Sequence, residues 1–242
     1  MQDAKPLIVI TGASRGIGAA LAQIYAETGR DVLAIARQPA SDGDERIRRF
    51  AADLTRPEEV ARSIAHIRSL GRPVDMLINN AGVQYAMDFA GNSGKEPANA
   101  DLIAAEIALN LTAPLLLIQG VAPLMARPGG TIVNVTSLVS RHPKPSAPVY
   151  SATKAGLHSF TESLRGQFAG SGMNIIEAVP PLVDTGMTLG RGRNKLSARQ
   201  MAQEIRDGVE RGDRVVAPGL SRKVLFLNRI VPSLVARILA RN

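Results

Sequence analysis

The chain has 242 residues, of which 45% are hydrophobic and none is cysteine, and its 29 basic and 21 acidic side chains give a formal net charge of +8. This length and apolar content fit one large α/β domain, and the lack of cysteine excludes disulfides, thiolate catalysis and thiolate zinc sites. Residues 1–5 carry no signal-peptide pattern, so we expect a cytoplasmic protein.

The positive charge is concentrated at one end of the chain. Twelve of the 29 basic and four of the 21 acidic residues follow Gly190, so residues 1–190 carry 17 of each sign. Such an excess fits a partner bearing phosphate or carboxylate groups, an anionic membrane surface, or a solvated basic tail. Nucleic-acid binding is disfavoured, because three tyrosines, five phenylalanines and no tryptophan leave few side chains for base stacking.

Apolar runs and helical patterns alternate along the chain. The predicted strands are residues 7–11, 31–36, 50–52, 74–80, 131–135, 174–179 and 214–217. The predicted helices are 19–25, 57–70 with Thr55 as N-cap, a segment ending near Ala126, one beginning near Tyr150, and one capped by Ser197 and ending near Glu210. The strands lack in/out alternation, which predicts a doubly wound parallel sheet with helices on both faces, in a single domain spanning residues 1–242.

Residues 107–126 contain no charged side chain and are long enough to span a bilayer. Asn110, Pro114 and Pro123 interrupt this stretch. We therefore interpret it as a buried helix of the domain and not as a membrane span.

A glycine-rich turn, residues 11–18, follows the first predicted strand and opens the first predicted helix. Gly12 permits a sharp turn, and Gly16 and Gly18 let backbone amides approach a pyrophosphate at the positive end of that helix. An ordinary tight turn would use the same residues. The position after the first strand of an alternating chain nevertheless favours dinucleotide binding and a Rossmann-type sheet.

The end of the second predicted strand indicates which dinucleotide is bound. An acidic residue there would bind the ribose 2′-hydroxyl of NAD, but this chain has Ala36 followed by Arg37. Arg37 and Arg15 offer two guanidinium groups for a 2′-phosphate, which favours NADP(H) over NAD(H). The alternative is that both arginines only face water.

Tyr150 and Lys154 are four residues apart at a predicted helix start, so they project from one face. A nearby ammonium would lower the pKa of the phenol from about 10 toward neutrality, where general acid–base catalysis works best. A solvated surface pair is the alternative, because this spacing is common on helices.

Several motifs together resemble the short-chain dehydrogenase/reductase family. They are the glycine turn at Gly12, the sequence Asn79-Asn80-Ala81-Gly82, Asn110, Ser137, and the segment Tyr150-Ser151-Ala152-Thr153-Lys154. Their order and spacing match from Leu7 to about Met187. The resemblance implies that Tyr150 exchanges the proton of a carbonyl or hydroxyl group, Lys154 assists it and holds the nicotinamide ribose, Ser137 binds the substrate oxygen, and Asn110 fixes a water linking Lys154 to solvent.

The resemblance also implies a set of cofactor contacts. They are Gly12, Ser14, Arg15, Gly16, Ile17 and Gly18 in the turn, Arg37, Asp53 at the adenine, Asn80 beside the adenosine ribose, Lys154, and Val183 and Thr185 near the nicotinamide. Turn, cap and helix hydrogen-bonding roles remain the alternatives for Asp53, Ser137 and Asn110 taken singly.

Two segments depart from the family pattern. Pro181 stands where the family usually has glycine, and the sequence Pro180-Pro181-Leu182-Val183-Asp184-Thr185 resembles a bacterial branch of the family. We expect residues 185–196 to form a substrate lid and residues 220–242 to form a basic amphipathic tail with an apolar stripe at 224, 227, 231, 235 and 238. Docking of this stripe on its own domain or on a sister subunit is favoured over contact with an anionic membrane.

These observations predict an NADP(H)-dependent oxidoreductase that transfers hydride between nicotinamide and a small-molecule carbonyl or secondary alcohol. The rival is a non-catalytic dinucleotide-binding redox sensor or scaffold. We expect a homodimer or homotetramer, no metal and no nucleic-acid partner. The sequence does not indicate which carbonyl compound is used.

Overall fold

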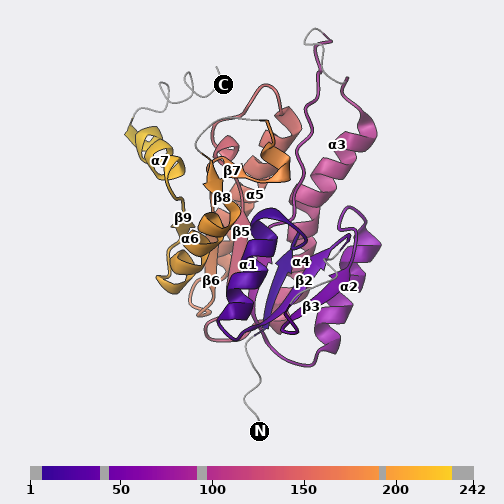
Figure 1. The fold of residues 1–242 in the computed structure, drawn as a ribbon, viewed down its shortest axis with the longest axis vertical. Coiled ribbons are helices and arrows are strands. Elements are labelled where there is room, and N and C mark those ends of the chain that lie inside the picture. The colour runs from indigo at the N-terminus through magenta and orange to yellow at the C-terminus, as the bar shows by residue number, and fades with distance from the viewer. Residues whose placement is uncertain (1–6, 39–43, 92–96, 191–194, 231–242) are drawn as a thin grey trace.

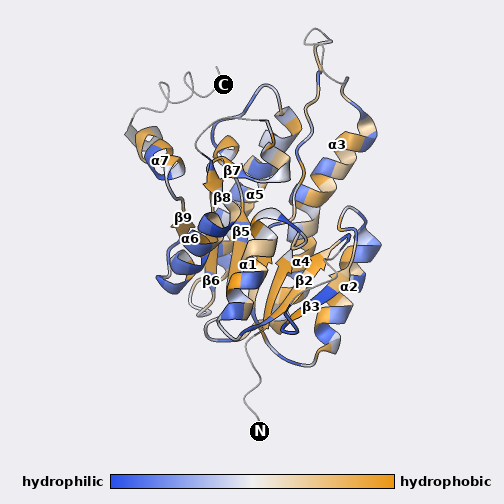
Figure 2. Ribbon diagram, in the orientation of Figure 1, coloured by the Kyte–Doolittle hydropathy of each residue, from blue (hydrophilic) through white to orange (hydrophobic). Residues whose placement is uncertain are grey.

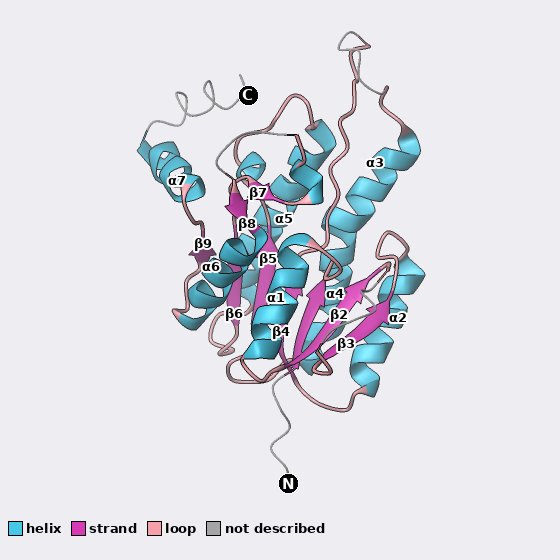
Figure 3. Cartoon of the chain, viewed as in Figure 1, coloured by secondary structure: helices cyan, strands magenta, loops and turns pink. Residues whose placement is uncertain are grey.

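A computed structural model describes residues 7–38, 44–91, 97–190 and 195–230, which form an α/β structure built on one seven-stranded parallel sheet (Figures 1 and 3). The strand order is β3-β2-β1-β4-β5-β6-β9. These strands are β1 (Leu7–Thr11), β2 (Asp31–Ala36), β3 (Ile47–Ala51), β4 (Val74–Asn79), β5 (Thr131–Val135), β6 (Asn174–Ala178) and β9 (Val215–Val216).

Helices cover both faces of the sheet, which confirms the predicted doubly wound, Rossmann-type class. The helices are α1 (Gly16–Glu27), α2 (Pro57–Ser69), α3 (Ala100–Ile107), α4 (Ala113–Val121), α5 (Pro148–Gln167), α6 (Ala198–Glu210) and α7 (Leu220–Ile230). α1 and α6 pack together on one face, and α2, α4 and α5 contribute to the core on the other.

The central strands are apolar because both of their sides face a helix layer. All five residues of β1 are buried, and Val9 pairs with Leu33 of β2 on one side and Leu77 of β4 on the other. The apolar colour of these strands is visible in Figure 2. The strand order reverses between β1 and β4, so loops leave the sheet in opposite directions there and open a crevice at the carboxyl ends of the strands.

Two predictions about the edge of the sheet were wrong in detail. The outer strand β3 begins at Ile47 and not at Phe50, and it carries Arg48 on an exposed edge position. Thr55 does not cap α2, because Arg56 occupies the N-cap position, without a side-chain cap bond. The Thr55 hydroxyl instead donates to a carboxylate oxygen of Asp53 at 2.9 Å. By contrast, Ser197 does cap α6, in a reciprocal capping box with Gln200.

One stretch of the described chain, Ala100–Leu124, is long and apolar enough to cross a membrane by length and composition. It consists of α3 and α4, joined by a π-helical turn, Ala108–Thr112, and of a final 3₁₀ turn, Ala122–Leu124. Leu117 and Val121 of α4 belong to the core beneath the sheet, whereas Ile107 is 40% exposed. The helix thus packs within the domain, as predicted, but part of its surface is exposed.

Two short strands, β7 (Val183–Asp184) and β8 (Leu196–Ser197), pair beside the crevice. They hold the described ends of the predicted lid, of which residues 191–194 lie outside the described residues. In the tail, Val224 of α7 is buried against the domain but Leu227 is 47% exposed. The predicted stripe therefore docks through Val224 and not through Leu227, and its positions 231, 235 and 238 lie outside the described residues.

Candidate active site

A cleft of about 1170 Å³ lies where β1, β4, β5 and β6 end. It brings together thirteen of the residues predicted for the site. They are Gly12, Ser14, Arg15, Gly16, Ile17, Arg37, Asp53, Asn80, Ser137, Tyr150, Lys154, Val183 and Thr185. Gly18 and Asn110 do not line the cleft; they lie behind its walls.

The glycine turn is shaped by close backbone packing. Gly12 has φ +67°, and a Cβ atom there would lie 2.7 Å from the Cα of Ala81. A Cβ atom on Gly18 would lie 2.3 Å from the carbonyl oxygen of Gly12. Gly18 therefore lets α1 pack closely against the turn. The predicted approach of Gly16 and Gly18 to a pyrophosphate stays a prediction.

Asn80 and Thr11 fasten the turn to the end of β4. The Asn80 side-chain amide donates to the carbonyl oxygen of Thr11 at 3.0 Å, while the Thr11 hydroxyl accepts from the backbone amides of Asn80 at 3.0 Å and Ala81 at 3.1 Å. Thr11 was not singled out from the sequence, although a hydroxyl at the end of an apolar strand was a signal for such a role.

The two arginines predicted for the cofactor both line the cleft. Arg15 and Arg37 are both exposed, and neither forms an ion pair within the described ranges. Across the turn, a Cβ atom on Gly16 would lie 3.2 Å from a methyl carbon of Thr185, and one on Gly186 would lie 3.7 Å from the Arg15 guanidinium. The glycine turn and the loop after β7 thus form opposing walls.

Tyr150 and Lys154 lie on one face of α5, with the Lys154 ammonium 5.8 Å from the centre of the Tyr150 ring. Lys154 is buried, and its ammonium donates to the carbonyl oxygen of Val135 at 2.8 Å. Burial lowers the pKa of Lys154 to about 8, although the negative charge of Glu106 opposes this effect. The lysine is thus poised to titrate near neutral pH.

Asn110 is fully buried in the π-helical turn. Its side chain accepts from the amide of Val83 at 2.9 Å, donates to the carbonyl of Val83 at 2.8 Å and reaches the Thr153 hydroxyl at 3.3 Å. The side chain is therefore occupied in fixing the loop after β4, beside Lys154, and is turned away from the cleft.

Ser137 begins a short 3₁₀ turn whose two ends are held by Glu177 of β6. The buried Glu177 carboxylate accepts from the Thr136 hydroxyl at 2.6 Å and from both terminal nitrogens of Arg141, at 3.2 and 2.7 Å. His158 of α5 lies 3.1 Å from the same carboxylate. This network fixes the segment that carries Ser137.

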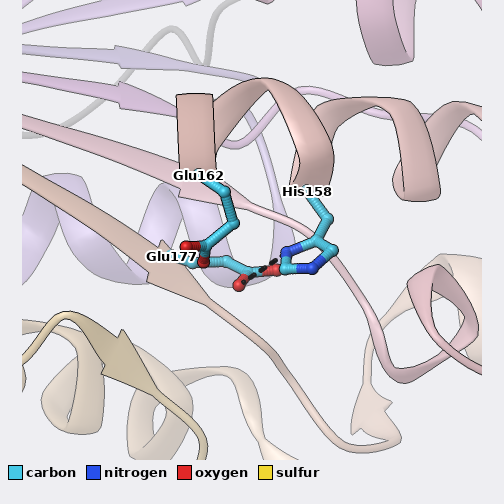
Figure 4. Close-up of side chains that lie close together, drawn as sticks. All are labelled: His158, Glu162 and Glu177. Atoms are coloured by element: carbon cyan, nitrogen blue, oxygen red, sulfur yellow. Dashed lines mark hydrogen bonds and ion pairs between the residues drawn. The ribbon is translucent and has the colours of Figure 1, made fainter. Parts of the chain in front are cut away.

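His158, Glu162 and Glu177 place one ligand atom each within 4.8 Å of one another, a spacing that a metal ion could use (Figure 4). The Arg141 guanidinium already occupies both oxygens of Glu177, however. A cation would have to displace this positive group, so the cluster is better suited to supporting the Ser137 turn than to holding a metal.

Some residues of the cleft and its surroundings were not predicted from the sequence. His142 and Lys144 line the cleft after β5, and Gln84 lines it after β4. Within the lid, Lys195 bonds the Thr188 carbonyl at 2.6 Å and Asp184 at 3.3 Å, so its charge is used inside the loop. A histidine or lysine in a proline-rich loop has no characteristic spacing from other residues, so the sequence could not have identified these positions.

The fold and the cleft together define a dinucleotide-binding oxidoreductase with a tyrosine–lysine pair. A family model described as short chain dehydrogenase matches residues 6–195. The chain belongs to the short-chain dehydrogenase family and is an NAD(P)-dependent oxidoreductase, as the motifs predicted. The narrower resemblance to a bacterial branch stays a prediction.

Similar proteins cover nearly the whole chain. The uncharacterized oxidoreductase DltE of Bacillus subtilis is 34% identical over 223 residues, which are 86% of each chain. A short-chain dehydrogenase from Burkholderia cenocepacia in complex with NADP is 26% identical, with a TM-score of 0.86 and 99% of each chain covered. One from Sphingobium yanoikuyae in complex with NADPH is 27% identical, with a TM-score of 0.78, and covers 95% of this chain and 94% of that one.

Proposed function

We propose that the protein uses NADP(H) to interconvert a small-molecule carbonyl and a secondary alcohol, with Tyr150 as general acid and base. One cleft brings Tyr150, Lys154 and Ser137 together beside a glycine turn, and this arrangement carries the proposal. A non-catalytic sensor would have no need for these three side chains in one place.

The residues of the cleft fit NADP(H). Gly12 and Gly16 have no side chain that would fill the turn. The exposed Arg15 and Arg37, which form no ion pair among the described residues, supply positive charge for a 2′-phosphate. The Burkholderia and Sphingobium structures, solved with NADP and NADPH, support this cofactor. The residues proposed to hold it are Gly12, Ser14, Arg15, Gly16, Ile17, Arg37, Asp53, Asn80, Lys154, Val183 and Thr185, with Gly18 acting through packing.

When bound, the nicotinamide supplies or accepts the hydride. During reduction, Tyr150 donates its phenolic proton to the substrate oxygen, and it withdraws that proton in the reverse direction. The Ser137 hydroxyl donates a hydrogen bond to the same oxygen and orients it. Lys154 stabilises the phenolate that Tyr150 leaves, and Asn110 acts through the loop that it fixes beside Lys154.

Substitution Tyr150→Phe tests the chemistry. Because a positioned acid–base group contributes on the order of 10²–10⁴-fold, we expect kcat for NADPH oxidation to fall by at least about 100-fold. The measurement uses a panel of ketones, aldehydes and 3-oxoacyl thioesters, with NADPH binding as the control that should be retained. Unchanged turnover in the variant would contradict the mechanism and favour the redox-sensor alternative.

Substitution Arg37→Asp tests the cofactor preference. A hydrogen bond to a charged group contributes about 1.5–3 kcal/mol, so we expect roughly 10- to 100-fold weaker NADPH binding and little change for NADH. The control is Arg48→Asp, which changes an exposed arginine of β3 that does not line the cleft. Equal losses for both cofactors in Arg37→Asp would refute the assignment.

We also propose that the protein works as a cytoplasmic homodimer or homotetramer. The partly exposed apolar helix Ala100–Leu124 supports an interface between copies of the chain. The basic excess after Gly190 supports no nucleic-acid or membrane partner by itself.

A further inference from the structure

The cleft holds one cation that the proposed reaction does not use. The lysines and arginines that line it among the described residues are Arg15, Arg37, Lys144 and Lys154. The two arginines are proposed for the 2′-phosphate and Lys154 for Tyr150, which leaves Lys144 without a role. The Lys144 side chain is half-buried, and the only lysine that forms an ion pair within the described ranges is Lys195.

The backbone of Lys144 is fastened to the helix that carries Tyr150. The Ser151 hydroxyl accepts from the Lys144 amide at 3.0 Å, and the Lys144 carbonyl accepts from the Ala147 amide at 3.0 Å. Ser151 is buried and donates to the Ala147 carbonyl at 2.8 Å. Because Ser151 directly follows Tyr150, these bonds fix Lys144 beside the first turn of α5. The proposed acid and this ammonium therefore belong to one wall of the cleft.

The charges around Lys144 favour an anion. Asp53 is the only acid among the described residues that line the cleft, and it follows β3, on the far side of β1 from β5. Helix α5 begins with no side-chain cap and no acid in its first turn. No acidic side chain there offsets the positive end of its dipole, which adds to the charge of Lys144.

His142 lines the same wall, two residues before Lys144, and is only 7% exposed. Its Nε2 atom has no hydrogen-bond partner in the described part of the chain. Burial lowers the pKa of His142, and the charge of Arg141 adds to this effect, so the ring is neutral at pH 7. A buried polar nitrogen without a partner is costly, and a polar group bound in the cleft would supply one.

The other side chains that line the cleft beyond Ser137 are mainly apolar, among them Val139, Leu182 and Met187. They suit a hydrocarbon body and not a second charge. One ammonium beside a neutral imidazole matches a single negative charge, whereas two arginines are available for the 2′-phosphate. This combination fits a carboxylate better than a phosphate.

We propose that Lys144 determines specificity by binding a carboxylate of the substrate, so that the protein acts on oxo acids: carbonyl compounds with an apolar body and one carboxylate group. This inference rests on the proposed function, because the carbonyl oxygen is the one that Ser137 and Tyr150 would bind. The carboxylate anchored at Lys144 orients the carbonyl toward Tyr150 and takes no part in the hydride transfer.

The test compares oxo acids with their methyl esters, in a series that varies the number of carbon atoms between the carbonyl and the carboxylate. We expect the wild type to prefer the acid over the ester. Lys144→Met removes the charge and keeps a long side chain. It should lower kcat/KM for the preferred acid by roughly 10- to 100-fold, mainly through KM, and change kcat/KM for its ester little.

Two further variants separate the charge of Lys144 from its bulk. Lys144→Arg keeps a cation and should retain most of the preference for the acid. Lys223→Met is the matched control, because Lys223 is an exposed lysine of α7 that does not line the cleft. It should leave kcat/KM for both compounds at the wild-type value.

A binding measurement does not depend on turnover. A hydroxy acid bound beside NADPH cannot react, because the cofactor is already reduced. By calorimetry, the wild type loaded with NADPH should bind the hydroxy acid roughly 10- to 100-fold more tightly than its methyl ester. In Lys144→Met, the two dissociation constants should become similar.

The inference is overturned if the wild type binds and reduces the esters as well as the acids throughout the series, a comparison that needs no variant. It is also overturned if Lys144→Met weakens acid and ester equally, or if a phosphate-bearing ketone is preferred over every oxo acid. A wild type that reduces no carbonyl compound refutes the proposed function instead, and the binding of hydroxy acids still decides the role of Lys144.

Discussion

Glu177 shows how one buried acid can support both stability and the conformation of the segment that carries Ser137. Burial alone would raise its pKa, but hydrogen bonds from His158, Arg141 and Thr136 outweigh this effect and bring the pKa to about 2. A carboxyl group with a lowered folded-state pKa stabilises the protein at pH values above its unfolded value. That contribution is lost as the pH falls from about 4.5 toward 2.

We therefore expect Glu177→Gln to lower the free energy of unfolding by about 2–3 kcal/mol at pH 7 and by much less at pH 3. Denaturant unfolding at the two pH values measures this difference. The matched control is Glu162→Gln, because Glu162 is an exposed member of the same cluster that pairs with Arg165. If both variants lost the same stability at pH 7, the assigned role of the Glu177 network would be wrong.

The residues of this site differ in how far the sequence could reveal them. Tyr150 and Lys154 are four positions apart on one helix, so local geometry was enough to pair them. Glu106 and Glu177 each stand alone in an apolar segment, which signals a buried acid but not its partner. Arg141 lies 36 positions before Glu177, and only the folded arrangement of β6 beside the segment after β5 brings these two groups together.

At the scale of elements, the central strands were predicted well because burial on both faces makes each of them a continuous apolar run. The edge strand β3 was predicted three residues short at its start, because an exposed edge tolerates Arg48 and Arg49 and so hides the pattern. The two predicted helix N-caps, Ser197 and Thr55, likewise differ in outcome: the first was right and the second was wrong. Ser197 has its Gln200 partner three residues on, whereas Asp53 competes for the Thr55 hydroxyl.

The π-helical turn Ala108–Thr112 is an element that the periodicity of the sequence does not reveal. It inserts an extra residue into the helix and rotates the next turns about the helix axis, so that Asn110 faces Val83 and Thr153 while Leu117 faces the core. The family resemblance singled out Asn110, but its contacts depend on this turn. This local irregularity therefore positions the side chain that holds the loop after β4 beside Lys154.

At the scale of the whole molecule, the cleft exists because loops from both halves of the sheet meet where the strand order reverses. Of the basic residues that follow Gly190, Lys195 is bonded within its own loop, to the Thr188 carbonyl and to Asp184. Apolar surface outside the cleft is also exposed. Only 33% of the most apolar 18 residues of the helix Ala100–Leu124 are buried.

A largely apolar helix with one face in the core and one face in water is stabilised when a second copy of the chain covers it. We therefore expect the wild-type protein to be a homodimer or homotetramer and Leu116→Lys to dissociate it, because Leu116 is 36% exposed on α4 and lysine would place a charge in the interface. Phe226→Lys is the control, since Phe226 is 65% exposed on α7, away from this helix. Light scattering coupled to size-exclusion chromatography gives the mass of each. A wild-type monomer would contradict the predicted assembly. Dissociation by Phe226→Lys alone would move the interface away from α4 and assign the apolar face of α7 as the contact instead.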